Sequence, residues 1–211
     1  MTDTLDLGRI VIKWLGHATF WIKCDHLSIY IDPYDLEGAR EPADLVLITH
    51  GHYDHFDKKS IDLLKKPGML VVMPDVIAHK IPDSKGVSQV DKFEVLGIKV
   101  QVMPAYNVNK PYHPRGAGVG YILTIGNKKI YHAGDTDLIP EMKDLEFQGL
   151  EVALLPIGGT YTMDAAEASE VASIIKPKIV VPMHYGKVVK ADPWKFKSMV
   201  GDDAEVRVLE R

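Results

Sequence analysis

The sequence predicts an α/β fold in which mixed β-sheets are flanked by helices. Short apolar or alternating segments of strand length recur along all 211 residues, and this is the pattern expected of half-buried and fully buried strands. The first third is rich in strands with hairpin-like connections, whereas the later strands alternate with segments of helical spacing. This order favours mixed sheets with helices packed against them.

The sequence predicts a series of strands and five helices. The strands are Ile10–Leu15, Thr19–Cys24, Leu27–Ile31, Leu45–Ile48, Met69–Met73, Ile98–Met103, Val119–Ile125, Lys129–Tyr131, Val152–Leu155, Ile179–Val181 and Val206–Leu209. The clearest helix is Asp164–Lys176, because Asp164 can cap it, Glu167 completes a capping box and Pro177 stops it. Weaker helical spacing marks Asp57–Lys66, Asp75–Lys80, Leu138–Leu145 and Pro193–Val200.

Composition and length indicate a single domain over residues 1–211. Hydrophobic residues make up 46% and charged residues 26%, as in ordinary globular proteins. The net charge of -4 gives no overall attraction for nucleic acid, and no apolar run reaches the roughly 18 residues of a membrane span. The amino-terminal residues do not form a secretory signal, and one cysteine, Cys24, excludes an internal disulfide framework. We therefore expect a cytoplasmic protein, with assembly into a homo-oligomer left open.

The segment HGHYDH at residues 50–55 is the most informative part of the chain. It places His50, His52, Asp54 and His55 directly after an apolar run. Residues two apart in an extended strand point to the same side, so His50 and His52 can bind one ion, whereas Asp54 and His55 require a turn. Such a pattern should arise by chance about once in a thousand chains, and structural zinc sites usually rely on cysteines. The segment therefore predicts a strand, a bend and a bound metal ion.

Two later apolar runs also end in a side chain that can bind metal. One leads to Asp135 and the other to His184. Ligands at the ends of neighbouring strands can meet at one edge of a sheet. Alternatively, Asp135 is a turn or N-cap aspartate and His184 is a hydrogen-bonded histidine at a strand end. The motif at residues 50–55 favours metal binding for both.

Other polar residues are placed to bind or support the metal. His113 and Asn107 lie in a long loop between two expected strands, and such loops are often functional; His113 can bind metal, and Asn107 can contact a metal-bound water or a substrate oxygen, unless both only stabilise the loop. His17 lies in a glycine-marked turn and can face the substrate. Asp32 can orient a metal-binding imidazole through its other ring nitrogen, or it is a turn residue before a proline.

At this point the residues resemble a known family. The segments are GHAT at residues 16–19, IDP at 31–33, THGHYDH at 49–55, HAGDT at 132–136, GGTYTM at 158–163 and PMHY at 182–185. Together they resemble metallo-β-lactamase-fold hydrolases, of the branch that includes ascorbate-6-phosphate lactonase-like proteins and N-acylphosphatidylethanolamine phospholipase D. The resemblance implies a four-layer αββα sandwich with a metal site, often binuclear, at one edge.

The resemblance also implies a role for each matching residue. His50 and His52 would bind a first ion, Asp54 and His55 a second, Asp135 would bridge both ions, and His184 would complete the second. One departure stands out, since the branch often has another histidine where this chain has Asn107. Either His113 replaces that histidine or the first ion is bound more weakly.

The expected function is hydrolysis by a metal-activated water. A divalent ion lowers the pKa of bound water and polarises a carbonyl or phosphoryl oxygen, and Asp54 and Asp135 are the expected catalytic carboxylates. The expected substrate is a small, anionic ester, lactone, amide or phosphodiester, with Tyr161 near its binding site and Lys110 and Arg115 as further contacts. Zinc is the first choice of metal, one ion or two, with manganese, iron or nickel as alternatives. The rival interpretations are a protein that binds metal or a metabolite without turnover and, ranked last, a nuclease.

Overall fold

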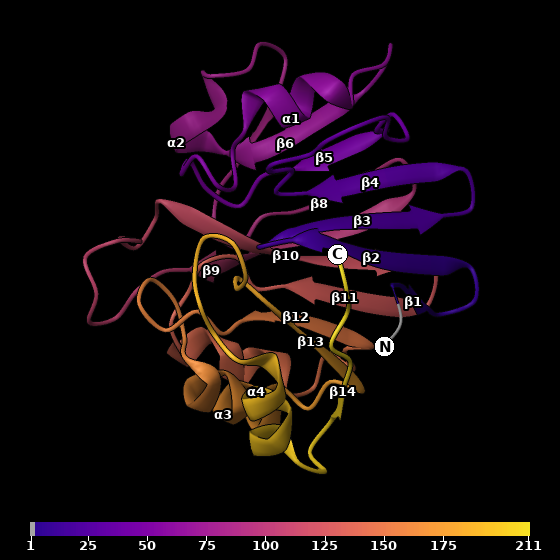
Figure 1. Cartoon of the computed structure of the whole chain (residues 1–211). Coiled ribbons are helices and arrows are strands. Elements are labelled where there is room, and N and C mark those ends of the chain that lie inside the picture. Colours follow the sequence, from indigo (N-terminus) through magenta and orange to yellow (C-terminus); the bar gives the residue numbers. More distant parts are fainter. Residues whose placement is uncertain (1–2) are drawn as a thin grey trace. The chain divides into compact units, whose positions relative to one another are not determined.

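The structure, a computed structural model, describes residues 3–211. The chain divides into two compact units (Figure 1). Unit 1 runs to Val87 and also includes Leu209–Arg211, and unit 2 is Ser88–Val208. Each unit contains one mixed sheet of seven strands, which confirms the predicted α/β class with two mixed sheets. The single domain predicted from the sequence stays a prediction.

The sheet of unit 1 follows the order of the chain, from β1 at one edge to β7 at the other. Neighbouring strands are antiparallel from β1 to β4 and parallel from β4 to β7. The strands are β1 (Leu5–Asp6), β2 (Ile10–Gly16), β3 (Thr19–Cys24), β4 (Leu27–Ile31), β5 (Leu45–Leu47), β6 (Leu70–Pro74) and β7 (Lys85–Val87). Its helices are α1 (Lys58–Leu63) and α2 (Asp75–Ala78).

The sheet of unit 2 repeats the same succession of pairings. Its strands are antiparallel from β8 to β11 and parallel from β11 to β14. They are β8 (Lys92–Val95), β9 (Ile98–Ala105), β10 (Gly118–Ile125), β11 (Lys128–His132), β12 (Val152–Pro156), β13 (Ile179–Met183) and β14 (Glu205–Val206). The helical elements are the 3₁₀ helix η1 (Pro140–Leu145), α3 (Ala165–Ile175) and α4 (Pro193–Val200).

The strands that the sequence did not predict are short and lie at or near sheet edges. They are β1, β7 and β8. Only one residue in each of β1 and β7 is buried, and none in β8, so they lack the apolar runs by which strands are recognised. The last predicted strand, Val206–Leu209, pairs instead over Glu205–Val206, and η1 begins at Pro140 because proline is favoured in a first helical turn.

Each unit has its own buried core. In unit 1, Ile61 of α1 and Ile77 of α2 pack with Val46 and Met73 of the sheet. In unit 2, α3 buries Ala168, Val171, Ala172 and Ile175 on one face, which is the spacing of an amphipathic helix. The predicted capping box of α3 is present, because Asp164 accepts from the backbone of Glu167 and Glu167 accepts from the backbone of Asp164.

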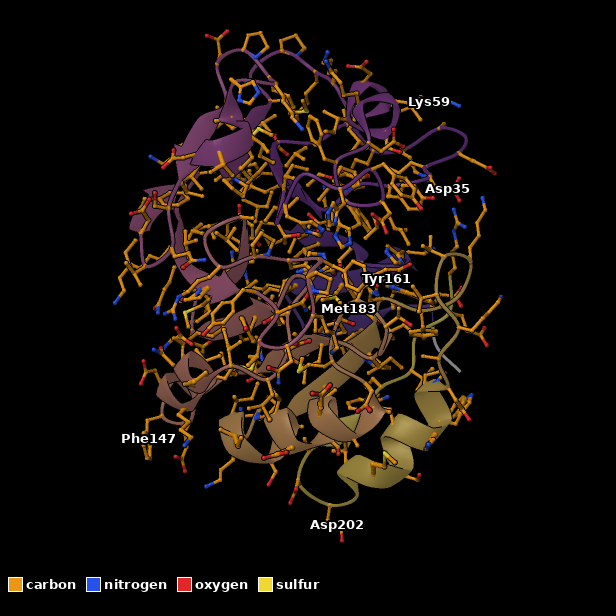
Figure 2. All side chains as sticks on the ribbon, turned by 90° about the vertical axis from the view of Figure 1, so that its left-hand side faces the viewer. Asp35, Lys59, Phe147, Tyr161, Met183 and Asp202 are labelled. Carbon is orange, nitrogen blue, oxygen red and sulfur yellow. The ribbon has the colours of Figure 1, made fainter. Side chains whose placement is uncertain are left out.

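The buried and exposed side chains of unit 2 contrast clearly in Figure 2. Met183 at the end of β13 is fully buried, whereas Phe147 is 90% exposed and extends into solvent. Within residues 3–211, no helix combines the length and apolar character needed to cross a membrane.

Low pH should reduce the stability of unit 2, because it protonates Glu151, the residue before β12. The Lys128 and Lys178 ammonium groups, 2.7 and 2.9 Å from the carboxylate, hold its pKa below the ordinary value of 4.5. A carboxyl whose folded pKa is lowered stabilises the fold above its unfolded pKa, and this stabilisation is lost as pH falls through the folded pKa. We therefore expect the stability gap between the natural chain and Glu151→Gln, measured by urea unfolding, to be present at pH 7 and to close below about pH 4. A gap that stays constant down to pH 3 would contradict this.

Candidate metal centre

The predicted metal ligands of unit 1 lie in the turn after β5. Residues 50–55 leave the carboxyl end of that strand, and the turn closes where the backbone of His55 and Phe56 donates to the carbonyl of His52. Nε2 of His50 lies 3.0 Å from Nδ1 of His52. Because the strand ends at Leu47 and residues 51–52 form a bend, it is this bend, and not the alternation of an extended strand, that brings the first two histidines together.

A buried network around Asp32 fixes the protonation of two of these histidines. One Asp32 oxygen, Oδ2, accepts from the Thr49 hydroxyl at 2.6 Å and from Nδ1 of His55 at 2.7 Å, and the other accepts from the Thr49 backbone at 2.7 Å. Because the hydroxyl proton of Thr49 points to Asp32, its oxygen accepts from Nδ1 of His50 at 3.0 Å. Both His50 and His55 therefore carry their proton on Nδ1 and present an unprotonated Nε2.

His17 and Asp54 form a second contact in unit 1. Nε2 of His17 donates to the Asp54 carboxylate at 3.0 Å, and atoms of His17, Asp54 and His55 lie within 4.8 Å of one another. His17 is 5% exposed. This partly buried pair places one proton between an imidazole and a carboxylate.

The predicted ligands of unit 2 meet at Asp135. This residue follows β11, and its Oδ2 lies 2.9 Å from Nε2 of His184, which follows β13, and 3.3 Å from Nε2 of His113. All three side chains are at least 96% buried. Three segments that are far apart in the sequence thus supply one carboxylate and two imidazoles at the same place.

Asn107 fixes the protonation of His113. The amide nitrogen of Asn107 donates to Asp137 Oδ1 at 3.0 Å and to the Tyr161 carbonyl at 2.9 Å, so its oxygen must face His113. That oxygen accepts from the His113 backbone at 3.0 Å and lies 3.1 Å from Nδ1, which is also 3.1 Å from the Tyr161 carbonyl. Since both neighbours of Nδ1 are acceptors, Nδ1 carries a proton, and in the neutral imidazole Nε2 is the electron-pair donor.

These atoms of unit 2 fit a divalent cation. An unprotonated Nε2 of His113 faces a carboxylate oxygen at 3.3 Å, and two electron-pair donors at that distance repel unless a cation or proton lies between them. Imidazole and carboxylate donors suit zinc and related divalent ions. Asp135, His113 and His184 are therefore candidate ligands of a divalent ion.

The backbone near both ligand sets is strained. His17, Asp32 and His184 are in the left-handed region, with φ of 51°, 47° and 60°, which is unfavourable for residues other than glycine and occurs most often at functional sites. Gly158 is required because there is no space for a side chain. A Cβ there would lie 2.8 Å from Nδ1 of His184 and 2.9 Å from its carbonyl oxygen.

Asn107 does not offer its side chain to a metal or a substrate, because the nitrogen and the oxygen of its side-chain amide both form hydrogen bonds inside unit 2. Its partner Asp137, which sequence reasoning assigned no role, also accepts from the Val108 backbone at 3.0 Å and from Lys110 at 2.7 Å. The only sequence signal for Asp137 was its place as the second acidic residue of the stretch 135–137. Thr49 was missed as well, although it stands immediately before the motif.

Lys110 and Arg115, the basic residues of the loop, both form ion pairs within unit 2. Lys110 contacts Asp137 and donates to the Thr162 carbonyl at 2.7 Å, and Arg115 pairs with Glu141 and lies over the ring of Tyr106. The exposed groups beside His113 are aromatic. Tyr112 and Tyr161 are 43% and 39% exposed and pack edge to face with ring centroids 4.7 Å apart.

Replacing Asn107 should weaken metal binding only indirectly, because Asn107 positions His113. Asn107→Ala removes the amide oxygen that accepts from His113 and the amide nitrogen that holds that oxygen in place. The loss of such supporting groups typically costs 10–100-fold in metal affinity. Asn107→Gln, which keeps the amide but displaces it, should recover part of that loss. Competition with a fluorescent zinc chelator measures the affinity, and the exposed Asn127 gives the matched control Asn127→Ala. Unchanged affinity in Asn107→Ala would show that the contact only holds the loop.

Comparisons with known proteins place the chain in one family. The family model described as a β-lactamase superfamily domain matches residues 11–184. A protein of Thermococcus onnurineus named UPF0173 metal-dependent hydrolase is 37% identical over 95% of this chain and 96% of its own length. A homologue of that name from Methanopyrus kandleri is 36% identical over 94% and 96%.

Solved structures show the same fold. Igni18, a metallo hydrolase of Ignicoccus hospitalis, superposes with a TM-score of 0.82 at 30% identity, over 95% of both chains. A protein from Parabacteroides distasonis superposes with a TM-score of 0.90 at 32% identity, over 100% of this chain and 99% of that one. The narrower resemblance to lactonase-like and phospholipase D-like proteins stays a prediction.

Proposed function

Because the chain belongs to the UPF0173 metal-dependent hydrolases of the β-lactamase superfamily, we propose that it cleaves an ester, lactone, amide or phosphodiester bond of a small substrate with a metal-activated water. The observation that carries this most directly is the unprotonated Nε2 of His113 facing the Asp135 carboxylate at 3.3 Å. A cation or a proton must lie between these two atoms, and we propose that it is a divalent cation. The imidazole-rich ligand set makes zinc our first choice, with manganese, iron or nickel as alternatives.

Each ligand set is proposed to bind a divalent ion. In unit 1 the ligands are His50, His52, Asp54 and His55, and in unit 2 they are His113, Asp135 and His184. A divalent ion held by such ligands supplies a hydroxide nucleophile near neutral pH and polarises the oxygen under attack. Asp32 and Asn107 support this by holding His50, His55 and His113 in the tautomer that binds metal.

The pair of His17 and Asp54 is proposed to handle the proton. The Asp54 carboxylate accepts from Nε2 of His17 at 3.0 Å, so a proton taken up by Asp54 remains next to an imidazole that can exchange it. Proton transfer by a positioned carboxylate or imidazole commonly contributes 10²–10⁴-fold to a rate. Asp54 is therefore proposed as a catalytic residue as well as a ligand.

The substrate is proposed to place its apolar or aromatic part against Tyr112 and Tyr161. Their rings are exposed, and the Tyr161 carbonyl contacts Nδ1 of His113 at 3.1 Å, so the pair lies beside a proposed ligand. An anionic group on the substrate, which the sequence suggested, would have to compete with Asp137 for Lys110 and with Glu141 for Arg115. Aromatic side chains supply large contact area at low entropic cost.

Metal analysis combined with a substrate panel tests the proposal. Protein loaded with zinc or manganese is assayed against bis-para-nitrophenyl phosphate, para-nitrophenyl acetate, phenylacetyl and acetyl homoserine lactones, and simple anilides. We expect activity on one bond class, lost with EDTA and restored by metal. If that class is the lactones, we expect a preference for the phenylacetyl over the acetyl homoserine lactone. Fully bound metal with no turnover of any class would favour the rival interpretation, a protein that binds metal or a metabolite without catalysis.

A further inference from the structure

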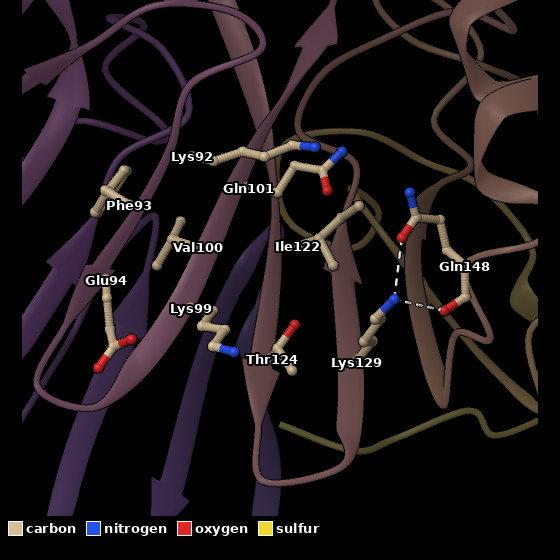
Figure 3. Close-up of a pocket in the computed structure, with 10 residues that line it drawn as sticks. All are labelled: Lys92, Phe93, Glu94, Lys99, Val100, Gln101, Ile122, Thr124, Lys129 and Gln148. Atoms are coloured by element: carbon tan, nitrogen blue, oxygen red, sulfur yellow. Dashed lines mark hydrogen bonds between the residues drawn. The ribbon is translucent and has the colours of Figure 1, made fainter.

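Unit 2 carries a groove that the metal ligands do not use (Figure 3). It has a volume of about 400 Å³ and is lined by residues of β8, β9, β10 and β11 and by Gln148. We propose that this groove binds an organic anion, with its carboxylate or phosphoryl group held between Lys99 and Lys129 and its apolar part against Ile122. A volume of this size is typical of small-molecule sites.

Strand register explains how the groove is built. Glu94, Lys99, Thr124 and Lys129 are successive cross-strand partners on β8, β9, β10 and β11. Side chains in one such row share a face of the sheet, and neighbouring strands are about 4.8 Å apart. Lys99 and Lys129 therefore flank Thr124, with about 10 Å between the backbones of their strands.

The adjacent row supplies a mixed surface. Lys92, Gln101 and Ile122 are successive partners two residues along the same strands. Ile122 is buried under the groove, whereas Lys92 is exposed. An apolar side chain surrounded by donors suits a ligand that has both an anionic and an apolar part.

The positive charge of the groove is not neutralised by the protein. In the part of the chain that the structure describes, Lys92 and Lys99 have no ion-pair partner, and Lys129 bonds only to the carbonyl and amide oxygens of Gln148, at 2.8 and 3.0 Å. Figure 3 shows both of these bonds. Glu94 is the one acid among the lining residues. Three lysines against one glutamate leave a local excess of positive charge on a chain whose net charge is -4.

The groove is separate from the metal ligands of unit 2. Lys129 lies near the amino end of β11, whereas Asp135 follows the carboxyl end of the same strand. The three residue steps of the strand from Lys129 to His132 alone cover about 10 Å, and Asp135 is not among the residues that line the groove. The proposal therefore concerns a second site, and it does not depend on the reaction that the chain catalyses.

Phenylphosphonate, which a hydrolase does not cleave, serves as the probe. Amide chemical shifts of the full chain are followed during titration, with and without EDTA. We expect shifts that centre on residues 99, 124 and 129 and do not depend on EDTA, at least about tenfold weaker binding in Lys99→Ala and Lys129→Ala because one charge-assisted contact is typically worth that much, and tighter binding in Glu94→Gln.

Matched controls separate the groove from general attraction to lysine. Lys195→Ala removes an exposed lysine of α4 in the same unit, and inorganic phosphate and benzyl alcohol each carry only one of the two recognised features. Lys195→Ala should bind as the natural chain does, and both simple probes should bind more weakly. Binding that is lost with EDTA, that follows Lys195 equally, or that is unchanged in Lys99→Ala and Lys129→Ala would overturn the proposal.

Discussion

Asp135→Asn is expected to empty the ligand set of unit 2 and to reduce hydrolysis by more than about 100-fold. Its Oδ2 is the atom that faces both His113 and His184, and a neutral amide can no longer offset the charge of a divalent ion. Changes in groups that only support ligands already cost 10–100-fold in metal affinity, so loss of a ligand should exceed that range. Metal content after gel filtration and kcat/KM on the substrate identified by the panel are the two measurements.

Asp144→Asn is the matched control for this change, because Asp144 is an exposed aspartate of η1 in the same unit. It should keep both metal and activity. If Asp135→Asn retained its full metal content and turned over normally, Asp135 would be a structural residue that binds two histidines.

Asp32→Asn is expected to destabilise unit 1 by about 1–3 kcal/mol, the usual cost of leaving a buried hydrogen-bond donor without an acceptor. The Asp32 carboxylate is fully buried and accepts three hydrogen bonds, from Thr49 twice and from His55 once. An asparagine has the same shape, but its amide nitrogen would face at least one of these donors with a donor of its own. Urea unfolding measures the loss of stability, and chelator competition should show weaker metal binding by the same variant.

Asp25→Asn is a close control, since Asp25 has nearly the same left-handed backbone as Asp32, with φ of 48° against 47°. Its carboxylate is half exposed and pairs with Arg9, a contact that is typically worth at most about 1 kcal/mol. Equal losses in the two variants would mean that the backbone conformation, rather than the buried network, is responsible.

Most of the candidate ligands in each unit could be predicted because they follow strands that are easy to recognise. Leu45–Leu47, Lys128–His132 and Ile179–Met183 are buried strands, and apolar runs of this kind are the strongest local signal in a sequence. The residues that leave their carboxyl ends were therefore identifiable. The α3 capping box was equally clear, because it depends only on two side chains three residues apart.

The supporting residues could not be predicted, because their partners are distant in sequence. Asn107 contacts Tyr161, 54 residues later, and Asp137, 30 residues later. No local pattern encodes such contacts, and amides and carboxylates in loops usually serve the loop itself. The edge strands escaped for a different reason, since their side chains remain largely in solvent and their pairing depends on the strand beside them.

The division of unit 1 into two segments has a consequence for synthesis of the protein. Leu209, which is 2% exposed, and Arg211, which donates to Asp35 at 2.7 Å, belong to unit 1, yet they leave the ribosome only after the whole of unit 2. Domains usually fold as units while the chain is made. Here the first 87 residues must wait for the last three, so unit 1 is completed after unit 2 although its synthesis begins first.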